Sequence, residues 1–231
     1  MDDTYKRLAS EICTAAVKKS PGRLLVGVAG PPGCGKSTIA EQVVEIINES
    51  TSTDALCHAQ AVSLDGFHYT RSFLNTLPNR EEAYVRRGAP WTFDIDAILA
   101  FVTSLAVSAT LPATKRPRIR APSFDHALKD PKVDDIEISP GTSIVLLDGN
   151  YLLLDEEKWK DINPHLDVKI FVDVDASVAR ERVAKRHVAA GIEPTLEKGQ
   201  ERFDLNDAIN GELIRGNIVS CDLVVKSIPA T

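Results

Sequence analysis

Apolar positions fall into blocks along the chain, and their spacing changes from strand-like to helix-like and back. Continuous apolar runs bounded by turn residues are typical of buried parallel strands, and they occupy residues 24–29, 59–64, 143–147, 168–174 and 222–226. Between these runs, apolar residues recur at helical spacing, which predicts helices over residues 4–19, from 36 into the polar run 48–54, from 95 to 105, from 175 to 191 and over 196–217. This alternation predicts an α/β fold whose parallel sheet has helices on both faces.

Two segments break the alternation. In residues 70–93 the apolar positions follow neither a helical nor a strand-like spacing. Residues 112–140 contain five prolines. Within the second segment, residues 119–124 and 133–138 alternate apolar and polar side chains, which predicts a short hairpin outside the main sheet. Because no stretch has the composition of a linker, we expect residues 1–231 to form one domain with a small hairpin or lid insertion.

The first predicted strand runs into a glycine-rich loop and then into a helix. We assign nine consecutive residues to a nucleotide site: Gly30, Pro31, Pro32, Gly33, Cys34, Gly35, Lys36, Ser37 and Thr38. They contain Gly-x-x-x-x-Gly-Lys-Ser in its strand–loop–helix context. The glycines let backbone N–H groups approach a phosphate, and the helix adds its positive dipole end. We expect Lys36 to reach the β- and γ-phosphates and Ser37 to hold Mg²⁺, as in a P-loop NTPase.

Two carboxylates follow predicted strands at the sheet edge where ligands bind in such folds. Asp148 is expected to hold Mg²⁺, directly or through water, although a turn Asp before Gly149 is the alternative. Asp65 ends another strand. Because Mg²⁺ and ATP already have ligands, Asp65 is a candidate base for an acceptor hydroxyl. His68 belongs to the same polar cluster, which favours a site over a simple turn.

Two arginines on a predicted helix are candidates for closing over the phosphates. Arg182 and Arg186 lie one helical turn apart, so they share a face. Neighbouring guanidinium groups repel unless an anion lies between them, and their planar fork suits phosphate. A solvated charged face is the alternative explanation.

A second pair of arginines lies in the segment without clear period. Arg86 and Arg87 precede Trp91 and Phe93, and the intervening Gly and Pro exclude a regular helix. Two cations with two aromatic rings suit an acceptor pocket. The alternative is that the rings fill the core while the arginines are solvated.

Composition limits the classes of partner. A net charge of −6 lacks the basic excess of nucleic-acid-binding proteins. The apolar-rich stretch 98–111 is too short to span a membrane, and the first 19 residues do not form a secretory signal. The spacing of the four cysteines fits neither a disulfide framework nor a metal site, which favours reduced thiols and a cytoplasmic location. At the helix N-terminus, we expect Cys34 to have a lowered pKa and a reactive thiol.

Four motifs occur together in one order: the phosphate loop, Asp65-Gly66-Phe67, Arg86-Arg87-Gly88-x-Pro90-x-x-Phe93-Asp94, and Asp148-Gly149-Asn150-Tyr151. As a set they resemble the group of uridine kinase, phosphoribulokinase and bacterial-type pantothenate kinase. The resemblance covers about residues 24–225 and is closest to the nucleoside- or sugar-kinase-like branch.

This resemblance implies ATP and Mg²⁺ as cofactors and Asp65 as the catalytic base. Asp148 matches a position that is usually Glu in the relatives, and Arg182 and Arg186 fall in the lid region. Phe124, Asp125 and His126 match an acceptor-binding segment in which the relatives place Tyr where this chain has Phe124. Asn206 matches a segment near the nucleotide base.

The favoured hypothesis is therefore an ATP-dependent kinase that phosphorylates a hydroxyl of a small metabolite: a nucleoside, a pantothenate-like compound or a sugar. The alternative is a P-loop NTPase that hydrolyses ATP or GTP as a switch or assembly factor. A nucleotide-binding module without catalysis would leave Asp65 and Asp148 unexplained. A homo-oligomer is compatible with the sequence.

Overall fold

The computed structural model describes residues 1–50 and 58–227, so the end of the polar run 48–54 and Cys57 lie outside the described residues. Within those ranges, five strands form one parallel sheet in the order β2-β5-β1-β6-β7. Their bounds are Leu24–Ala29 (β1), Ala59–Ser63 (β2), Ile144–Asp148 (β5), Val168–Val174 (β6) and Leu223–Ser227 (β7). The predicted parallel sheet is confirmed.

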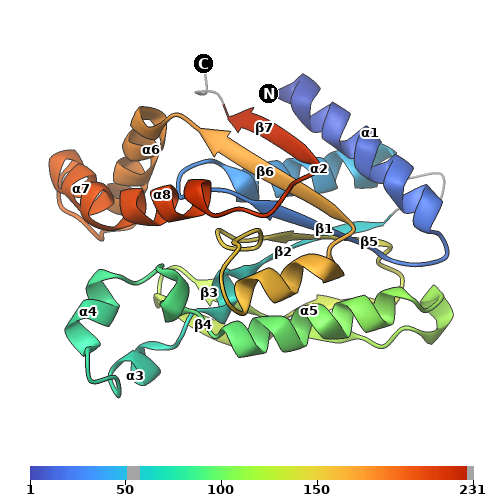
Figure 1. Cartoon of the computed structure of the whole chain (residues 1–231), viewed down its shortest axis with the longest axis horizontal. Helices are drawn as coiled ribbons and strands as arrows, with labels where there is room; N and C mark the ends of the chain where they lie inside the picture. The colour runs from blue at the N-terminus through green and yellow to red at the C-terminus, as the bar shows by residue number, and fades with distance from the viewer. Residues whose placement is uncertain (51–57, 228–231) are drawn as a thin grey trace.

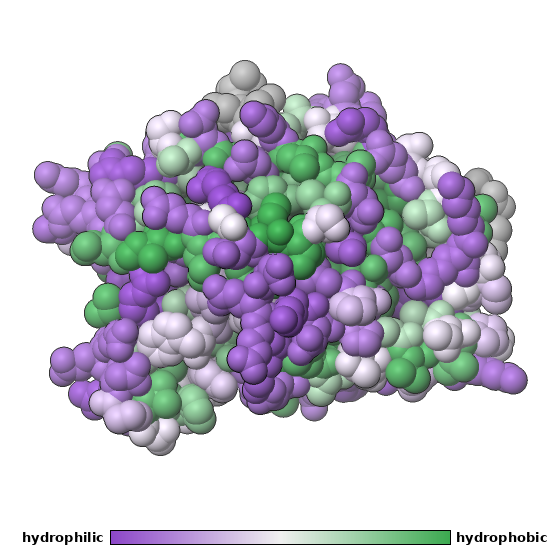
Figure 2. Space-filling model, viewed as in Figure 1, coloured by the Kyte–Doolittle hydropathy of each residue, from purple (hydrophilic) through white to green (hydrophobic). Residues whose placement is uncertain are grey.

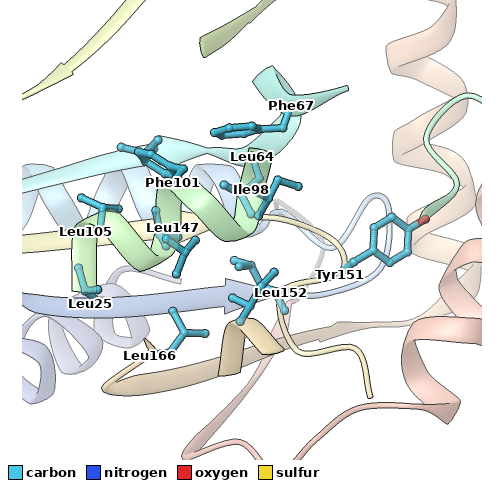
Figure 3. Close-up of a cluster of buried hydrophobic side chains, with 14 of the residues drawn as sticks. Leu25, Leu64, Phe67, Ile98, Phe101, Leu105, Leu147, Tyr151, Leu152 and Leu166 are labelled. Carbon is cyan, nitrogen blue, oxygen red and sulfur yellow. The ribbon is translucent and has the colours of Figure 1, made fainter. Parts of the chain in front are cut away.

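Helices cover both faces of this sheet (Figure 1). Side chains along β1 alternate between two hydrophobic cores, because successive residues of a strand point to opposite faces. One core packs against α1 (Asp2–Lys19) and α2 (Lys36–Ser50), and the other packs against α5 (Ile95–Ala109). Figure 3 shows the second core, where Leu25 of β1 lies near Leu105 of α5, and Leu147 of β5 belongs to the same cluster. Asp94 is the N-cap of α5, since its side chain accepts a hydrogen bond from the N–H of Ala97.

The C-terminal third adds a group of helices beside β6 and β7. They are α6 (Ala176–Ala189), α7 (Leu196–Arg202) and α8 (Ala208–Gly216), whereas the 3₁₀ helix η4 (Trp159–His165) precedes β6 and packs against α5. The single helix predicted over 196–217 is wrong in one respect: a π-helical turn, Phe203–Asp207, separates α7 from α8. No helix in the described part of the chain is long and apolar enough to cross a bilayer.

The insertion after β2 forms an arm of short elements. It contains α3 (Arg71–Leu74), α4 (Arg80–Val85) and the 3₁₀ turn η2 (Pro90–Thr92), and a further 3₁₀ turn, η3 (Ala113–Lys115), follows α5. The predicted hairpin is confirmed as a separate antiparallel pair, β3 (Ile119–Asp125) and β4 (Asp130–Ile138). Figure 1 shows that the α3–α4 arm and the α6–α8 arm project from the same side of the molecule. Figure 2 shows that hydrophilic side chains cover much of the outer surface of both arms.

Strand β2 ends one residue earlier than predicted because the chain turns sharply after Ser63. A 3₁₀ turn, η1 (Leu64–Phe67), begins there, and the Ser63 hydroxyl accepts a hydrogen bond from the N–H of Asp65 at 3.3 Å. The turn packs directly on the hairpin. A Cβ added at Gly66 would lie 2.1 Å from the carbonyl oxygen of Pro122, so only glycine fits this contact.

We predict that Gly66→Ala lowers the free energy of unfolding by about 1–3 kcal/mol, because the hairpin must shift to admit a methyl group. Urea denaturation measures the effect. Gly216→Ala is the matched control, since a Cβ there meets no atom within 4 Å. Equal stability of both variants would show that η1 and the hairpin are not in close contact.

Candidate active site

The phosphate loop joins β1 to α2 and lines a small cavity. Gly33 and Gly35 have φ values of 82° and 86°, in the left-handed region that residues with a Cβ adopt only with strain. The cavity has a volume of about 190 Å³ and is lined by Gly33, Gly35, Lys36, Ser37, Thr38, Arg182, Val183 and Arg186. We call it the phosphate-loop cavity. Its glycine cradle, helix N-terminus and cations together fit a polyphosphate.

The other loop residues support this cavity from beneath. A Cβ added at Gly30 would lie 2.3 Å from the carbonyl oxygen of Val172 in β6, so the start of the loop is packed tightly on the sheet. Gly30 and Pro31 are buried and do not line the phosphate-loop cavity, and Pro32 lines a second cavity. The structure therefore gives these three assigned residues a supporting place.

The expectation of a reactive Cys34 is wrong. The side chain is 0% exposed and packs in the core formed by α1, α2 and the sheet. Burial raises the pKa of the thiol, and this outweighs the opposing effects of Lys36 and of backbone N–H groups. The loop directs its backbone, not this side chain, toward the cavity.

Ser37 and Asp148 form a pair of oxygen ligands at the edge of the sheet. The Ser37 hydroxyl donates a hydrogen bond of 2.7 Å to Oδ1 of Asp148, which is buried at the end of β5. Burial raises the pKa of Asp148, while Lys36 and the Ser37 hydrogen bond oppose that shift. A hydroxyl and a carboxylate beside a phosphate cradle are the donor set that Mg²⁺ prefers, so these residues fit the ion.

A second cavity, of about 380 Å³, adjoins the first, and we call it the larger cavity. Lys36 and Arg186 line both cavities, whereas Asp65 lines only the larger one. Of the other residues predicted for the acceptor or the nucleotide, those lining the larger cavity are His68, Arg87, Phe124, His126 and Asn206. The structure thus brings together residues spread from the phosphate loop to α8.

His68 belongs to an aromatic layer under the larger cavity. Its ring lies 3.9 Å from that of Phe93 and 5.2 Å from that of Phe124, and its Nδ1 is 2.8 Å from the carbonyl oxygen of Asp65. Burial lowers the pKa of His68. The imidazole is therefore a packed, neutral group. It holds η1 in place and, with it, the backbone of Asp65.

Four residues predicted for the acceptor do not line the larger cavity. Phe93 is buried beneath His68, and Trp91 is 42% exposed outside both cavities. Oδ1 of Asp125 accepts hydrogen bonds from the N–H groups of residues 127 and 128 in the hairpin turn. Arg86 donates to the carbonyl oxygen of Leu205 and to Oδ1 of Asn210, so it joins the two arms. Phe93, Asp125 and Arg86 therefore have structural partners that their positions in the sequence did not reveal.

Asn206, which the resemblance implied to lie near the nucleotide base, lines the larger cavity and not the phosphate-loop cavity. Its Nδ2 donates to the carbonyl oxygen of Arg87 at 3.2 Å. The loop at 86–88 is also held by Tyr151, whose hydroxyl donates to the carbonyl oxygen of Gly88 at 2.6 Å. One wall of the larger cavity therefore depends on contacts between segments about 120 positions apart in the sequence.

Several lining residues were not assigned to the acceptor from the sequence: Arg71, Tyr84, Lys129, Asn150, His187, Arg202, Asp207 and Asn210. Asn150 could have been found, because it follows the metal candidate Asp148 by two residues at the ligand edge of the sheet. The others carry no local signal, since they come from the α3–α4 arm, the hairpin turn and the α6–α8 arm.

The sequence profile of the Phosphoribulokinase / Uridine kinase family matches this chain over residues 25–191. The chain belongs to this family. A Schizosaccharomyces pombe protein named "Putative uridine kinase C227.14" is 40% identical over 98% of this chain and 90% of its own length. Family membership makes the chain an ATP-dependent small-molecule kinase of the P-loop type.

The same family includes fungal kinases that are longer than the aligned region. The "ATP-dependent kinase YFH7" of Lachancea thermotolerans is 35% identical over 90% of this chain, and the alignment spans 66% of that relative. The crystal structure of YFH7 from Saccharomyces cerevisiae superposes with a TM-score of 0.83 at 28% identity, covering 96% of this chain and 98% of that one. The P-loop α/β fold is thereby confirmed.

Beside the larger cavity, His187 is buried in an environment that disfavours its charged form. Desolvation, Arg202 of α7 and Arg186 of its own helix lower its pKa from 6.5 to about 4, against a weaker opposing effect of Glu193. Nε2 lies 3.9 Å from Oδ2 of Asp207, whose own pKa is raised by burial. As the pH falls, the unfolded chain therefore takes up a proton at His187 before the folded chain does.

We predict that the contribution of His187 to stability is lost as the pH falls from 6.5 toward 4. Between pH 7 and pH 5, the wild-type protein should lose about 2 kcal/mol more unfolding free energy than His187→Gln. Urea denaturation at both pH values measures this difference. His58→Gln, at an exposed position, should keep the wild-type dependence on pH. Parallel profiles for wild type and His187→Gln would contradict the prediction.

Proposed function

We propose that this kinase transfers the γ-phosphoryl group of ATP to a hydroxyl group of a small metabolite bound in the larger cavity. The observation that carries the proposal is the junction of two cavities at Lys36 and Arg186. One cavity has the features of a polyphosphate cradle, and the other contains a carboxylate at the end of a parallel strand. Phosphoryl transfer requires such positioning of donor and acceptor on either side of the transferred group.

Asp65 is the candidate general base. It lines the cavity assigned to the acceptor and not the one assigned to the phosphates. Its backbone is fixed by the Ser63 hydroxyl and by His68, so the carboxylate has a defined position from which to accept a hydroxyl proton. The hydroxyl oxygen then forms a bond to the γ-phosphorus, while the bond from that phosphorus to the β–γ bridging oxygen breaks and ADP leaves with the electron pair.

Ser37 and Asp148 would hold Mg²⁺, which, when bound, neutralises charge on the phosphate oxygens. Lys36 adds a positive charge at the junction of the two cavities. Arg182 donates to the carbonyl oxygen of Gly33 and to the hydroxyl of Ser227, so it fastens α6 to the phosphate loop. Arg186 lies one turn further along α6, where its guanidinium can bind the transferred group.

A switch NTPase requires only water as the acceptor, and a second cavity of about 380 Å³ has no role in such a mechanism. The larger cavity therefore favours a metabolite kinase. A cytoplasmic location, a single kinase domain and the expected lack of nucleic-acid and membrane partners stay predictions, as does any homo-oligomer.

We predict that Asp65→Asn lowers kcat on the order of 10²-fold or more while the affinity for ATP stays near that of wild type. The amide keeps the shape of the side chain and cannot accept the proton. Lys36→Ala should reduce both transfer and ATP affinity, because the removed charge meets the phosphates. ADP release measures turnover, and equilibrium titration with ATP measures affinity. Asp161→Asn, at an exposed position outside both cavities, is the matched control. Loss of ATP binding in Asp65→Asn would place Asp65 among the metal ligands.

A further inference from the structure

The larger cavity has an excess of positive charge beyond what the nucleotide requires. Among the described residues, six cationic side chains line it against two carboxylates, Asp65 and Asp207. The cations are Lys36, Arg71, Arg87, Lys129, Arg186 and Arg202. Lys36 and Arg186 also line the phosphate-loop cavity, so they are accounted for by the nucleotide. Arg202 lies 3.7 Å from Glu193. Arg71, Arg87 and Lys129 are therefore the lining cations that neither the nucleotide nor Glu193 accounts for.

These three cations form one cluster where the α3–α4 arm meets the turn of the hairpin. Arg87 donates to the carbonyl oxygen of Lys129 at 2.6 Å. Oδ1 of Asp130 accepts hydrogen bonds from the backbone N–H of Arg71 at 2.8 Å and from Nη2 of Arg87 at 3.3 Å. Within the part of the chain that the structure describes, Asp130 is the carboxylate bonded to this cluster, which leaves it with net positive charge.

The cluster also contains a donor without a partner. Nε of Arg87 is buried and makes no hydrogen bond, although Nη1 and Nη2 of the same side chain are bonded. A buried donor left unpaired is costly, and a bound anion would satisfy it. The side chains of Arg71 and Lys129 line the cavity and form no ion pair among the described residues.

Other lining residues present unpaired acceptors. Oδ1 of Asn150, Oδ1 of Asn206 and Oδ2 of Asp207 are buried without a hydrogen-bond partner. The Asn206 amide orientation is fixed, because its Nδ2 donates to the carbonyl oxygen of Arg87. Acceptors of this kind are satisfied by hydroxyl donors of a ligand. The cavity therefore offers sites for several hydroxyl groups in addition to a site for an anion.

The ring of Phe124 in the cavity wall is not an open platform for a nucleobase. The guanidinium of Arg87 lies over the ring of Phe124, 5.6 Å from its centroid. The rings of His68 and His126 lie 5.2 Å from the same ring. Stacking of a base on Phe124 would have to displace Arg87 from its three hydrogen-bond partners.

We propose that the acceptor is a polyhydroxylated anion, a sugar phosphate or a sugar acid, whose anionic group binds Arg71, Arg87 and Lys129. This inference rests on the proposed function, because it takes the larger cavity as the acceptor site. Asn150, Asn206 and Asp207 accept hydrogen bonds from hydroxyl groups of the ligand, and Asp65 accepts the proton of the hydroxyl that is phosphorylated.

The test is turnover with neutral and anionic acceptors of related structure. Three matched sets serve as probes: glycerol, glycerol 3-phosphate and glycerate; ribose, ribose 5-phosphate and ribonate; glucose, glucose 6-phosphate and gluconate. Uridine and cytidine represent the neutral nucleosides. ADP release with MgATP gives kcat/KM for each compound. An anionic compound should exceed its neutral counterpart by about tenfold or more. The phosphate and carboxylate members of a set distinguish the two kinds of anion.

Two variants test the assigned residues without disturbing the wall. Arg71→Gln keeps the backbone N–H that binds Asp130. Lys129 has a φ of 56°, and Asn tolerates that conformation, so Lys129→Asn removes the charge with little strain. Each should lower the ratio of kcat/KM for anionic over neutral acceptors by about tenfold or more, mainly through KM. Lys132→Gln, a matched loss of charge on the same hairpin but outside the cavity, should keep the wild-type ratio.

The outcomes separate this inference from the proposed function. Phosphorylation of neutral sugars or nucleosides as efficient as that of the anions overturns the inference and leaves the kinase function in place. Wild-type ratios in both Arg71→Gln and Lys129→Asn overturn the assignment of the anion site. Failure of every probe to be phosphorylated, with ATP either intact or hydrolysed to ADP and phosphate, overturns the proposed function and the inference together.

Discussion

The parallel pairing of β5 with its two neighbours is the constraint on which the rest of the structure depends. Val28 of β1 and Ser63 of β2 both pair with Asp148 of β5, so all three strands end at the same edge of the sheet. The phosphate loop and η1 begin at that edge, and Asp148 ends β5 at the same edge. A shift of one residue would exchange the side chains that face the two cores and would turn Asp148 away from Ser37. The geometry of the site therefore depends on this register.

The acceptor side of the site has a different physical basis. Its walls are made by short elements that would not be stable alone, and polar contacts join them across the cavity. Arg86 binds the α6–α8 arm, Asn206 binds the loop at 86–88, and Tyr151 binds that loop from the end of β5. Such contacts hold the shape of the larger cavity while leaving its lining side chains accessible.

Burial determines which titratable groups around the site carry charge. His68 and His187 have lowered pKa values because desolvation disfavours their protonated forms, and burial raises the pKa values of Cys34 and Asp148. Arginine and lysine side chains line both cavities. The two cavities consequently contain fixed cations, neutral imidazoles and a small number of carboxylates. That distribution suits the binding of anionic ligands whose reacting groups meet between Lys36 and Arg186.

The sequence by itself determined the sheet, the phosphate loop and the Ser37–Asp148 pair, because strand periodicity, glycine spacing and strand-end carboxylates are local signals. It also indicated Asp65 and Arg87 for the acceptor. Only the tertiary structure separated Arg87 from Arg86, placed Trp91 and Asp125 outside the larger cavity, and buried the Cys34 thiol. It alone brought in Arg71 and Lys129, since the direction of a side chain in a loop depends on packing against segments far away in the chain. Local sequence patterns do not reveal that packing.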